Sequence, residues 1–598
     1  MDNHYYTIER NHQILISVLK ANGIRKVIAS PGTTNISLVG SIQHDPWFEI
    51  YSCVDERSAA YMACGMAAES GESVILSCTG ATASRNYMPA LTEAYYRKLP
   101  VLAITSHQGQ SRVGQLIAQN IDRSTIPNDI AKLSVTLTPC LNYSDEMNCE
   151  LSANRAIQEL KRNGGGPVHI NLISSYSWDF STKELPPARI IHRIAPGDTI
   201  PDIPEGNVAV FIGCHRRMSK EEEEAIDAFC ATYNAVCFCD HTSGYHGKYR
   251  LDFSLVCAQK LAASENTKVN TLIQIGEVSG DYYSILVEPS QVWRVSEDGE
   301  MRDTWQGRLT HVFQASEVDF FQIYAKENAQ ENSWLESCKA EYQCLYDMIP
   351  ELPFSNLWLA KNLSPRIPVG SAIHFGILNT LRSWNFFRLP QGVTSFSNVG
   401  GFGIDGNIST LLGAALASPD KLFFAVIGDL SFFYDLNCWG NRHLPTNMRV
   451  ILVNNGRGQE FVSFENRASK FGKNADLFIA AGGHFGQQSN TLVRHYAENL
   501  GIRYLSSATK DEAWQNADIF FTPDKLEAPI IWEVFTQSDD ENAALKTVRS
   551  LNLEKGLKKM EEEYKRCRLL SHLTFGKKHK QYKKKKRLLG LRLKELRS

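Results

Sequence analysis

Residues 424–461 read FAVIGDLSFFYDLNCWGNRHLPTNMRVILVNNGRGQEF. The pattern predicts an apolar strand that ends at Asp429, a helix from about Asp435, and a second apolar strand at 450–453 that stops before Asn455. Strands joined through a helix run parallel, and their carboxyl ends open on the same crevice. We therefore expect Asp429 and Asn455 to meet in that crevice, although they lie far apart in the chain.

The oxygen atoms of this crevice suit a hard cation. The carboxylate of Asp429, the amide oxygen of Asn455 and the backbone carbonyl of Arg457 offer three oxygen ligands, and Mg²⁺ would keep its other positions for water and phosphate oxygens. The residues after Asp429 open a helix, whose free N–H groups favour a diphosphate. An ordinary doubly wound unit with an aspartate at a strand end is the alternative, because short motifs give false positives. The predicted cofactor contacts are Gly428, Asp429, Leu430, Ser431, Asn455, Arg457 and Gly458.

The spacing between Gly428-Asp429 and Asn454-Asn455 resembles the cofactor motif of thiamine diphosphate (ThDP) enzymes, whose usual members read GDG where this chain reads GDLS. GDLS followed by Phe-Tyr-Asp-Leu-Asn is similar to one branch, the 2-succinyl-5-enolpyruvyl-6-hydroxy-3-cyclohexene-1-carboxylate synthases of menaquinone biosynthesis (MenD-type). The resemblance implies an α/β fold of three doubly wound parallel-sheet domains with ThDP and Mg²⁺ as cofactors.

Length and composition agree with several soluble domains. The chain has 598 residues, which suggests three to four domains. No run of about 18 apolar residues and no apolar signal segment appear, so we expect a cytoplasmic protein whose scattered cysteines stay reduced. By resemblance, the domains are a pyrimidine-binding domain at 1–185, a linking domain at 190–350, a diphosphate-binding domain at 351–545 and a basic tail at 546–598.

The N-terminal region alternates helices and strands. The segments SPGTTN, VDERSAAYMACGMA, SCTGATASRNYMPALTEAYYRKLPVLAIT and GGPVHINL occur in the order found in the pyrimidine-binding domain of ThDP enzymes. In this resemblance Glu56 matches the catalytic glutamate, whose carboxylic acid lies against N1′ of the aminopyrimidine and promotes proton removal from the cofactor. The alternative for Glu56 is an acid at a helix N-terminus that is stabilised by the helix dipole.

A glycine-rich segment at 392–410, GVTSFSNVGGFGIDGNIST, resembles the SNRGxxGIDG stretch of the MenD-type enzymes. The resemblance makes Asn398, Gly403, Ile404 and Asp405 candidate cofactor contacts. The alternative is a tight loop, because glycines allow close backbone approach to any neighbour. The linking domain carries no GxGxxG fingerprint, and we expect no flavin there.

Two departures from the MenD-type pattern concern the substrate. Thr33-Thr34 replaces Ser-Arg after Pro-Gly, and Val399 replaces the arginine of Asn-Arg-Gly. Those arginines bind substrate carboxylates in the family, and a lost guanidinium takes both charge and geometry from such a site. We therefore expect substrates other than 2-oxoglutarate and isochorismate. Gln119 matches a substrate-pocket glutamine of the family, and Arg85 and His107 are candidate replacements for the arginines.

The resemblance implies a decarboxylase or carboligase that removes carbon dioxide from a 2-oxo acid and passes the remaining fragment to an unknown acceptor. The alternatives are simple decarboxylation, for instance of phosphonopyruvate, a true MenD-type synthase, and a non-catalytic scaffold with the same fold. In the family, the catalytic glutamate and the diphosphate site meet across a subunit interface, which implies a homodimer or homotetramer.

The C-terminal segment 574–598 has a composition of its own, with 11 basic residues and one acidic residue. Together with its leucines, this charge favours peripheral contact with anionic lipid at the inner membrane. A solvated tail is the alternative, and we expect no nucleic-acid partner. The segment also resembles basic ends of proteins encoded with bacterial surface-polysaccharide enzymes, which suggests a role in polysaccharide precursor synthesis.

Overall fold

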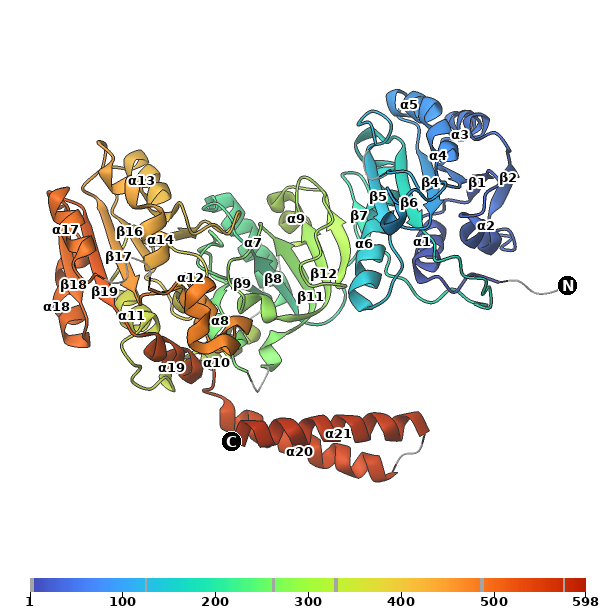
Figure 1. Ribbon diagram of the computed structural model, residues 1–598. Coiled ribbons are helices and arrows are strands. Elements are labelled where there is room, and N and C mark those ends of the chain that lie inside the picture. The colour runs from blue at the N-terminus through green and yellow to red at the C-terminus, as the bar shows by residue number, and fades with distance from the viewer. Residues whose placement is uncertain are drawn as a thin grey trace. The chain divides into compact units, whose positions relative to one another are not determined.

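The structure is a computed structural model that describes residues 5–123, 126–260, 264–326, 332–483, 489–573 and 576–597. It contains three parallel sheets with helices interleaved along the chain (Figure 1), so the predicted α/β fold is confirmed. The chain forms two compact units, one of residues 1–201 with 291–315 and one of residues 202–290 with 316–598. Within the described ranges, no helix is long and apolar enough to cross a membrane. The four domain limits given above stay a prediction.

The first sheet lies in the first unit, and its strands follow the order β2-β1-β3-β4-β6-β5 with every neighbour parallel. The strands are β1 (Lys26–Ala29), β2 (Glu49–Ser52), β3 (Val74–Cys78), β4 (Val101–His107), β5 (Leu133–Leu137) and β6 (Val168–Ile173). The helices are α1 (Arg10–Ala21), α2 (Ile36–Ile42), α3 (Glu56–Ser70), α4 (Thr82–Asn86), α5 (Met88–Tyr96) and α6 (Tyr143–Glu159), with 3-10 turns η1 (Gln110–Arg112) and η2 (Arg162–Gly164). Every residue of β3, β4 and β6 is buried, as a parallel sheet covered on both faces requires.

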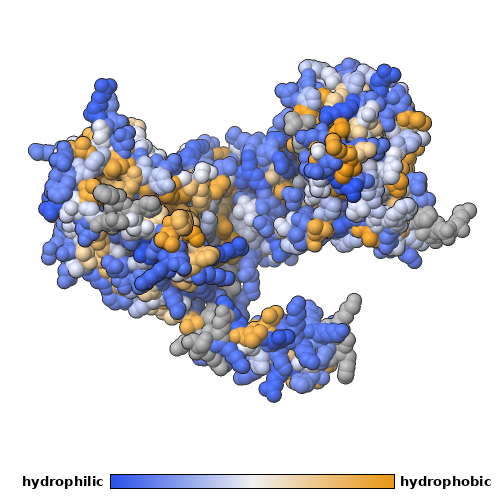
Figure 2. Space-filling model, in the orientation of Figure 1, coloured by the Kyte–Doolittle hydropathy of each residue, from blue (hydrophilic) through white to orange (hydrophobic). Residues whose placement is uncertain are grey.

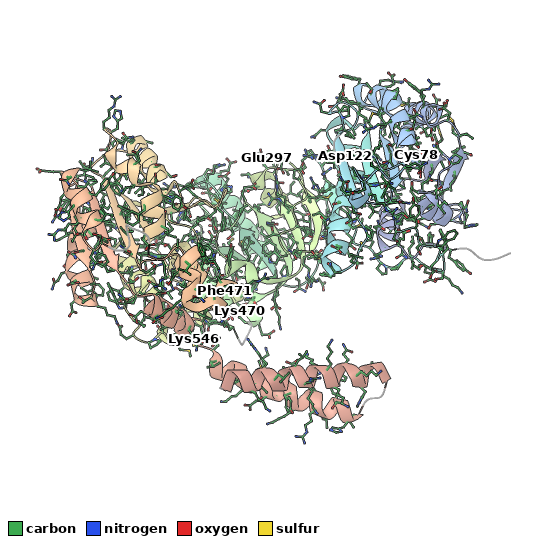
Figure 3. The ribbon with its side chains drawn as sticks, viewed as in Figure 1. Cys78, Asp122, Glu297, Lys470, Phe471 and Lys546 are labelled. Atoms are coloured by element: carbon green, nitrogen blue, oxygen red, sulfur yellow. The ribbon has the colours of Figure 1, made fainter. Side chains whose placement is uncertain are left out.

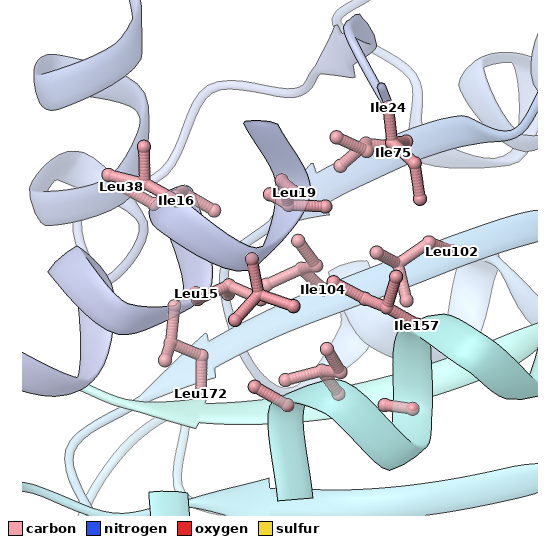
Figure 4. Packing of buried hydrophobic residues seen from close by; sticks show 14 of the residues in the cluster. Leu15, Ile16, Leu19, Ile24, Leu38, Ile75, Leu102, Ile104, Ile157 and Leu172 are labelled. Carbon is pink, nitrogen blue, oxygen red and sulfur yellow. The ribbon is translucent and has the colours of Figure 1, made fainter. Parts of the chain in front are cut away.

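The core of this unit forms where α1 and α6 pack on one face of the sheet (Figure 4). Leu15 and Leu19 of α1 and Ile157 of α6 contact the same apolar cluster as Leu102 and Ile104 of β4. On the other face, the alanine-rich helix α3 packs with α5. These two layers hold the loops at the carboxyl ends of the strands in place.

The third sheet lies in the second unit, with the order β15-β14-β16-β17-β19-β18 and parallel neighbours throughout. Its strands are β14 (Ala372–Phe375), β15 (Thr394–Ser397), β16 (Phe423–Gly428), β17 (Met448–Asn454), β18 (Arg503–Ser507) and β19 (Ile530–Phe535). Its helices are α11 (Asn356–Leu363), α12 (Asn379–Trp384), α13 (Asn407–Ala417), α14 (Asp429–Tyr434), α15 (Gln459–Val462), α16 (Ala475–Phe478), α17 (Leu492–Asn499), α18 (Lys510–Phe520) and α19 (Ser538–Val548), with η5 (Ser364–Arg366), η6 (Leu436–Gly440) and η7 (Arg467–Asn474).

The first and third sheets share one topology. Counted along each sheet's own segment, both place their strands in the order second, first, third, fourth, sixth, fifth. The chain therefore leaves the first and third strands of each sheet in opposite directions, and a crevice opens between their carboxyl ends. That crevice is where ligands bind in open α/β sheets.

The middle strands fall in both units. In the second unit, β10, β9, β8 and β11 pair in that order, and in the first unit β13 pairs with β12 and β7. Their bounds are β7 (His192–Ile194), β8 (Val208–Ile212), β9 (Val236–Cys239), β10 (Arg250–Asp252), β11 (Lys268–Ile275), β12 (Glu288–Val295) and β13 (Leu309–Phe313). The accompanying helices are α7 (Lys220–Tyr233), α8 (Ser254–Cys257), α9 (Glu317–Tyr324) and α10 (Ser333–Asp347), with η3 (Glu265–Thr267) and η4 (Ser284–Leu286).

The basic C-terminal segment is helical. Helix α20 (Leu553–Leu573) packs against α21 (Gly576–Arg597). Gly590 lies against the ring of Tyr564, and Lys585 pairs with Glu563 at 2.6 Å. The described residues of this basic segment therefore form a pair of helices.

Candidate functional site

A pocket opens at the carboxyl ends of β14, β16 and β17 in the third sheet. It encloses an empty volume of about 630 Å³, part of which is open solvent. Its position between the first and third strands of this sheet is the crevice that the topology creates. The residues lining it are Asn356, Gly376, Ile377, Leu378, Asn379, Thr380, Ile404, Asn407, Gly428, Asp429, Leu430, Ser431, Val453, Asn455, Arg457, Gly458, Gln459, Glu460 and Phe461.

Asp429 is the acid of this pocket, and only 2% of its surface is exposed. Its Oδ1 accepts a hydrogen bond from the N–H of Leu430 and its Oδ2 one from the N–H of Gly456, both at 2.8 Å. Burial raises the pKa of Asp429 to about 6, although the surrounding backbone N–H groups lower it. A carboxylate held in this way is costly to ionise without a cation beside it.

Asn455 supplies the second oxygen. Its Oδ1 is buried and has no hydrogen-bond partner among the described residues, and the residue lines the same pocket as Asp429. The side chain of Arg457 turns to Asp476, with Nη1 and Oδ2 3.2 Å apart. No group of three or more His, Cys, Asp or Glu able to hold a metal occurs in the part of the chain that the structure describes. The donor set therefore fits a hard cation held by one carboxylate, one amide oxygen and backbone.

The helix expected from about Asp435 begins six residues earlier. Helix α14 starts at Asp429 itself and ends at Tyr434, and the short turn η6 follows. Asp435 does not cap a helix of its own, because its carboxylate accepts hydrogen bonds from the N–H of Ser409 at 2.6 Å and from the hydroxyl of Ser409 at 2.5 Å. The sequence pattern did not reveal this link to α13.

A hydrogen-bond chain fixes the glycine-rich loop against the pocket. The hydroxyl of Ser431 donates to the carbonyl of Ile404 and accepts from Nδ2 of Asn407, both at 2.7 Å. Oδ1 of Asn407 lies 3.1 Å from Nε2 of the buried His374. Ile404 is thereby held in the pocket lining.

The other predicted residues of this loop lie outside the pocket lining. Asn398 donates from Nδ2 to Gly406 O at 3.3 Å and to the hydroxyl of Thr410 at 3.0 Å, and Asp405 is exposed. Gly403 lies beside the Asp405 carboxylate. The pocket thus brings together Ile404 and the seven residues predicted from the segment 424–461, but not Asn398, Gly403 or Asp405.

The pocket also has lining residues that follow β14, and these were not predicted from the sequence. Gly376, Ile377 and Leu378 line the pocket, and Leu378 has a φ of 65°, a conformation that a bulky side chain rarely adopts. Such strain is common where a loop shapes a site. The apolar run at 372–375 that ends in Gly376 is the signal that would have predicted this strand.

In the first unit, Glu56 is the first residue of α3. Asp55 caps this helix by accepting hydrogen bonds from the N–H groups of Arg57 and Ser58. The carboxylate of Glu56 is half-buried and accepts a hydrogen bond from Nδ2 of Asn86 at 3.3 Å. A capped helix start thus presents the carboxylate beside the short helix α4.

The predicted substrate residues occupy different surroundings. Thr34 is buried, and its hydroxyl donates to Ser106 O at 2.6 Å and contacts the hydroxyl of Thr79 at 2.5 Å. Thr33 and Gln119 are exposed. In the second unit, Val399 is buried, with its side chain close to Gly280.

Arg85 and His107 are the other two predicted substrate residues of the first unit. Nη2 of Arg85 donates to Asp122 O at 2.9 Å. His107 is buried, and its Nδ1 accepts the N–H of Gly109 at 3.1 Å, so Nε2 carries the proton of the neutral ring. Burial and the nearby charge of Arg123 lower the pKa of His107 to about 4.

A family described as thiamine pyrophosphate (another name for ThDP) enzyme, N-terminal TPP binding domain, matches residues 10–126. A 2-succinyl-5-enolpyruvyl-6-hydroxy-3-cyclohexene-1-carboxylate synthase of Bacteroides fragilis is 29% identical over 562 residues, which covers 90% of this chain and 98% of that protein. The chain is an enzyme related to the ThDP-dependent enzymes. The resemblance drawn from Gly428-Asp429 and the N-terminal segments is therefore confirmed.

Two further proteins were found to be similar to this chain. A synthase of the same name from Bacteroides thetaiotaomicron is 27% identical over 570 residues, with 90% of this chain and 98% of that protein covered. Among solved structures, a ThDP-dependent 4-hydroxybenzoylformate decarboxylase of Rhodococcus jostii is 18% identical, with a TM-score of 0.38, and the match covers 89% of this chain and 100% of that chain.

Proposed function

We propose that this protein is a ThDP- and Mg²⁺-dependent enzyme that removes carbon dioxide from a 2-oxo acid and transfers the remaining fragment to an acceptor. The proposal depends on one observation: Asp429 and Asn455 line the same pocket. The carboxylate of Asp429 is buried, and the buried amide oxygen of Asn455 accepts no hydrogen bond from the described residues. A cation would balance the negative charge of the Asp429 carboxylate and would accept the amide oxygen of Asn455 as a ligand.

We propose a separate role for each of these residues. Asp429, Asn455 and the backbone of Arg457 would hold Mg²⁺. When bound, ThDP would supply a nucleophilic carbon and a positively charged ring that accepts the electron pair left by departing carbon dioxide. Glu56 holds a proton at a pyrimidine nitrogen of the cofactor. Ile404, which Ser431 fixes in place, excludes water from the reacting carbon.

The substrate pocket differs from that of the MenD-type synthases. Thr34 and Val399 stand where those enzymes carry arginines, and both side chains are buried within their own units. Neither can replace a bidentate guanidinium for a carboxylate. We therefore propose a donor other than 2-oxoglutarate and an acceptor other than isochorismate.

The test is carbon dioxide release by the purified protein with ThDP and Mg²⁺. The panel contains pyruvate, 2-oxoglutarate, phosphonopyruvate and other 2-oxo acids, with and without a carbonyl or alkene acceptor. Release from one acid that stops when ThDP is omitted supports the proposal and names the donor. Failure to bind ThDP in calorimetry overturns it.

A true MenD-type synthase is the second candidate, favoured by the synthase relatives that match almost the whole chain. Conversion of isochorismate and 2-oxoglutarate to the synthase product would establish it. Product analysis separates carboligation from simple decarboxylation, for instance of phosphonopyruvate. A scaffold would bind ThDP without releasing carbon dioxide from any acid. The polysaccharide role stays a prediction.

We further propose that the protein assembles as a homodimer or homotetramer. In support, the segment 461–479 exposes Phe471, Leu477 and Phe478, and apolar side chains appear at the surface of the second unit in Figure 2. Exposed apolar groups of this size mark interaction surfaces. Light scattering coupled to size exclusion tests this, and a monomer at micromolar concentration contradicts it.

For the helices α20 and α21 we propose contact with anionic lipid. The exposed Leu588 and Leu591 stand among the basic residues of α21, and each basic group near such a surface adds about 1 kcal/mol. Deletion of 572–598 is expected to abolish sedimentation with phosphatidylglycerol vesicles. Unchanged sedimentation rejects the idea.

A further inference from the structure

A second cavity lies within the first unit, where strands β4 and β6 meet α4, α5 and the residues Arg123, Ile126 and Ile130. Its empty volume is about 350 Å³, part of which is open solvent. None of its lining residues is an aspartate or a glutamate. They are Ser84, Arg85, Tyr87, Met88, Leu91, Ala103, Thr105, Arg123, Ile126, Ile130 and His169.

Arg123 is the unusual member of this lining, since only 4% of its surface is exposed. Its Nη1 and Nη2 are both buried and have no hydrogen-bond partner among the residues that the structure describes. The pKa of Arg123 is lowered to about 10, chiefly by burial; the neighbouring Cys78 acts against this and the positive charge of Arg85 adds to it. A guanidinium without a partner in such a place destabilises the fold.

The neighbouring groups do not relieve this charge. Arg85 lines the cavity and is exposed. It donates a hydrogen bond to the carbonyl of Asp122, which precedes Arg123 in the chain and is labelled in Figure 3. Both ring nitrogens of His169 are engaged at 2.8 Å, one with the hydroxyl of Thr105 and one with that of Ser134. Tyr87 also lines the cavity, and its buried hydroxyl has no hydrogen-bond partner among the described residues. None of these lining side chains supplies a negative charge.

Arg449 shows how this chain buries an arginine for structure alone. It is fully buried in the second unit, and its Nη1 and Nη2 donate to the backbone carbonyls of Phe520, Thr522 and Asp524. Arg123 has nothing equivalent in the described ranges of the first unit. Arg449 therefore has acceptors for its guanidinium, whereas none of the described residues supplies one to Nη1 or Nη2 of Arg123.

We propose that Arg123, with Arg85 at the rim, binds a compact oxyanion in this cavity, either a carboxylate or a phosphate-like group. A planar guanidinium with both terminal nitrogens available matches two oxygens of such a group. The unpartnered hydroxyl of Tyr87 adds a polar contact to the lining, whereas the hydroxyls of Ser84 and Thr105 are engaged with Ala81 O and His169.

The cavity also adjoins the candidate catalytic acid. Arg85 lines the cavity, and the next residue, Asn86, donates a hydrogen bond to Glu56. If the function proposed above holds, on which this step rests, the anion is the acid group of a substrate held beside Glu56. A free anion that acts as an effector is the other source of the same chemistry.

Binding of inorganic phosphate to the full-length protein tests the site. Calorimetry and thermal unfolding are measured on the wild type, Arg123→Met, Arg123→Lys and the control Arg97→Met, whose exposed side chain pairs only with Glu93 at 3.4 Å. We expect Arg123→Met to weaken phosphate binding roughly 10- to 100-fold, since hydrogen bonds to a charged group are lost. Without phosphate its unfolding temperature should stay the same or rise, because an unpaired buried charge is gone.

Arg123→Lys keeps the charge but loses the paired donors, so it should fold and bind phosphate weakly even where Arg123→Met does not fold. Arg97→Met should behave as the wild type. Wild-type protein without saturable phosphate binding, or phosphate affinity equal in the wild type and both Arg123 variants, overturns the proposal.

The same variants separate the two sources of the anion. A raised KM for the 2-oxo acid, with ThDP affinity unchanged, assigns the site to a substrate. Loss of phosphate binding with KM unchanged assigns it to a free anion. ThDP binding is measured independently, so failure of the proposed function leaves the phosphate experiment intact.

Discussion

The first and third sheets have the same strand order but use their crevices differently. In the third sheet, the crevice between the first and third strands stays open and holds Asp429. In the first sheet, Thr34 and Thr79 meet across the corresponding position through their hydroxyls, and the buried charge, Arg123, lines a cavity elsewhere. One topology thus offers a crevice, and the side chains decide whether a ligand can enter it. The two buried charges have opposite signs, so they call for opposite ligands.

Glu56→Gln gives the largest expected effect on this comparison, because it tests whether the two sheets divide catalysis and cofactor binding. Turnover should fall by about 10²- to 10⁴-fold, the usual contribution of a proton-transfer group, while ThDP affinity stays unchanged. Carbon dioxide release and calorimetry measure the two quantities. Glu69→Gln, an exposed acid on the same helix, is the control. An equal loss of cofactor affinity would contradict the division.

Asp429→Asn tests the proposed cation site of the third sheet. The substitution keeps the shape but removes the charge that faces the cation, so Mg²⁺-dependent ThDP affinity should fall by about 100-fold or more, beyond the loss typical of an outer metal partner. Asp420→Asn, which changes an exposed acid paired with Lys525, should leave the affinity intact. Isothermal titration measures the Mg²⁺-dependent affinity for ThDP. An affinity of Asp429→Asn equal to that of the wild type would contradict the proposed metal site.

Glu541 is a second buried acid of the same unit, and it lies outside the pocket that contains Asp429. Its Oε1 accepts the N–H of Asn356 at 3.0 Å and the hydroxyl of Thr536 at 2.8 Å, and burial raises its pKa to about 7. The unfolded chain releases this proton near pH 4.3 and the folded chain near 7, so the free energy of unfolding falls as pH rises between those values.

Glu541→Gln should remove that decline, worth on the order of 3 kcal/mol above pH 7, and have no effect below pH 4. Urea unfolding from pH 4 to 8 measures it against the exposed control Glu527→Gln. Parallel pH profiles for wild type and Glu541→Gln would show that this carboxyl does not hold its proton in the folded state.

Ser431→Ala has the smallest expected effect and tests how firmly the pocket of the third sheet is prepared. The amide of Asn407 loses one of its two acceptors in a buried place and keeps the carbonyl of Ile404, so the free energy of unfolding should fall by about 1–3 kcal/mol. ThDP affinity should fall as well, because Ile404 is no longer fixed by Ser431. Ser418→Ala, at an exposed helix end, serves as the control. Unaltered stability would mean that the loop is held by other contacts.

Local patterns in the sequence were sufficient for the strands that carry the chemistry. Apolar runs bounded by glycine and asparagine predicted β16 and β17, and their parallel pairing follows from the helix between them. The meeting of Asp429 and Asn455 in one pocket follows from the same rule, since parallel strands end at one edge. The start of α14 was not predictable in this way, because the bond between Asp435 and Ser409 joins distant segments.

The sequence by itself determined the α/β alternation, the relation to ThDP enzymes and the candidate acids Glu56 and Asp429. Those features depend on residue spacing of a few positions, which strand and helix geometry translate directly. Only the tertiary structure decided which charges lack partners. Arg123 reads as an ordinary loop arginine in the sequence, and it becomes a binding candidate because packing removes water from its guanidinium without supplying an acceptor among the described residues.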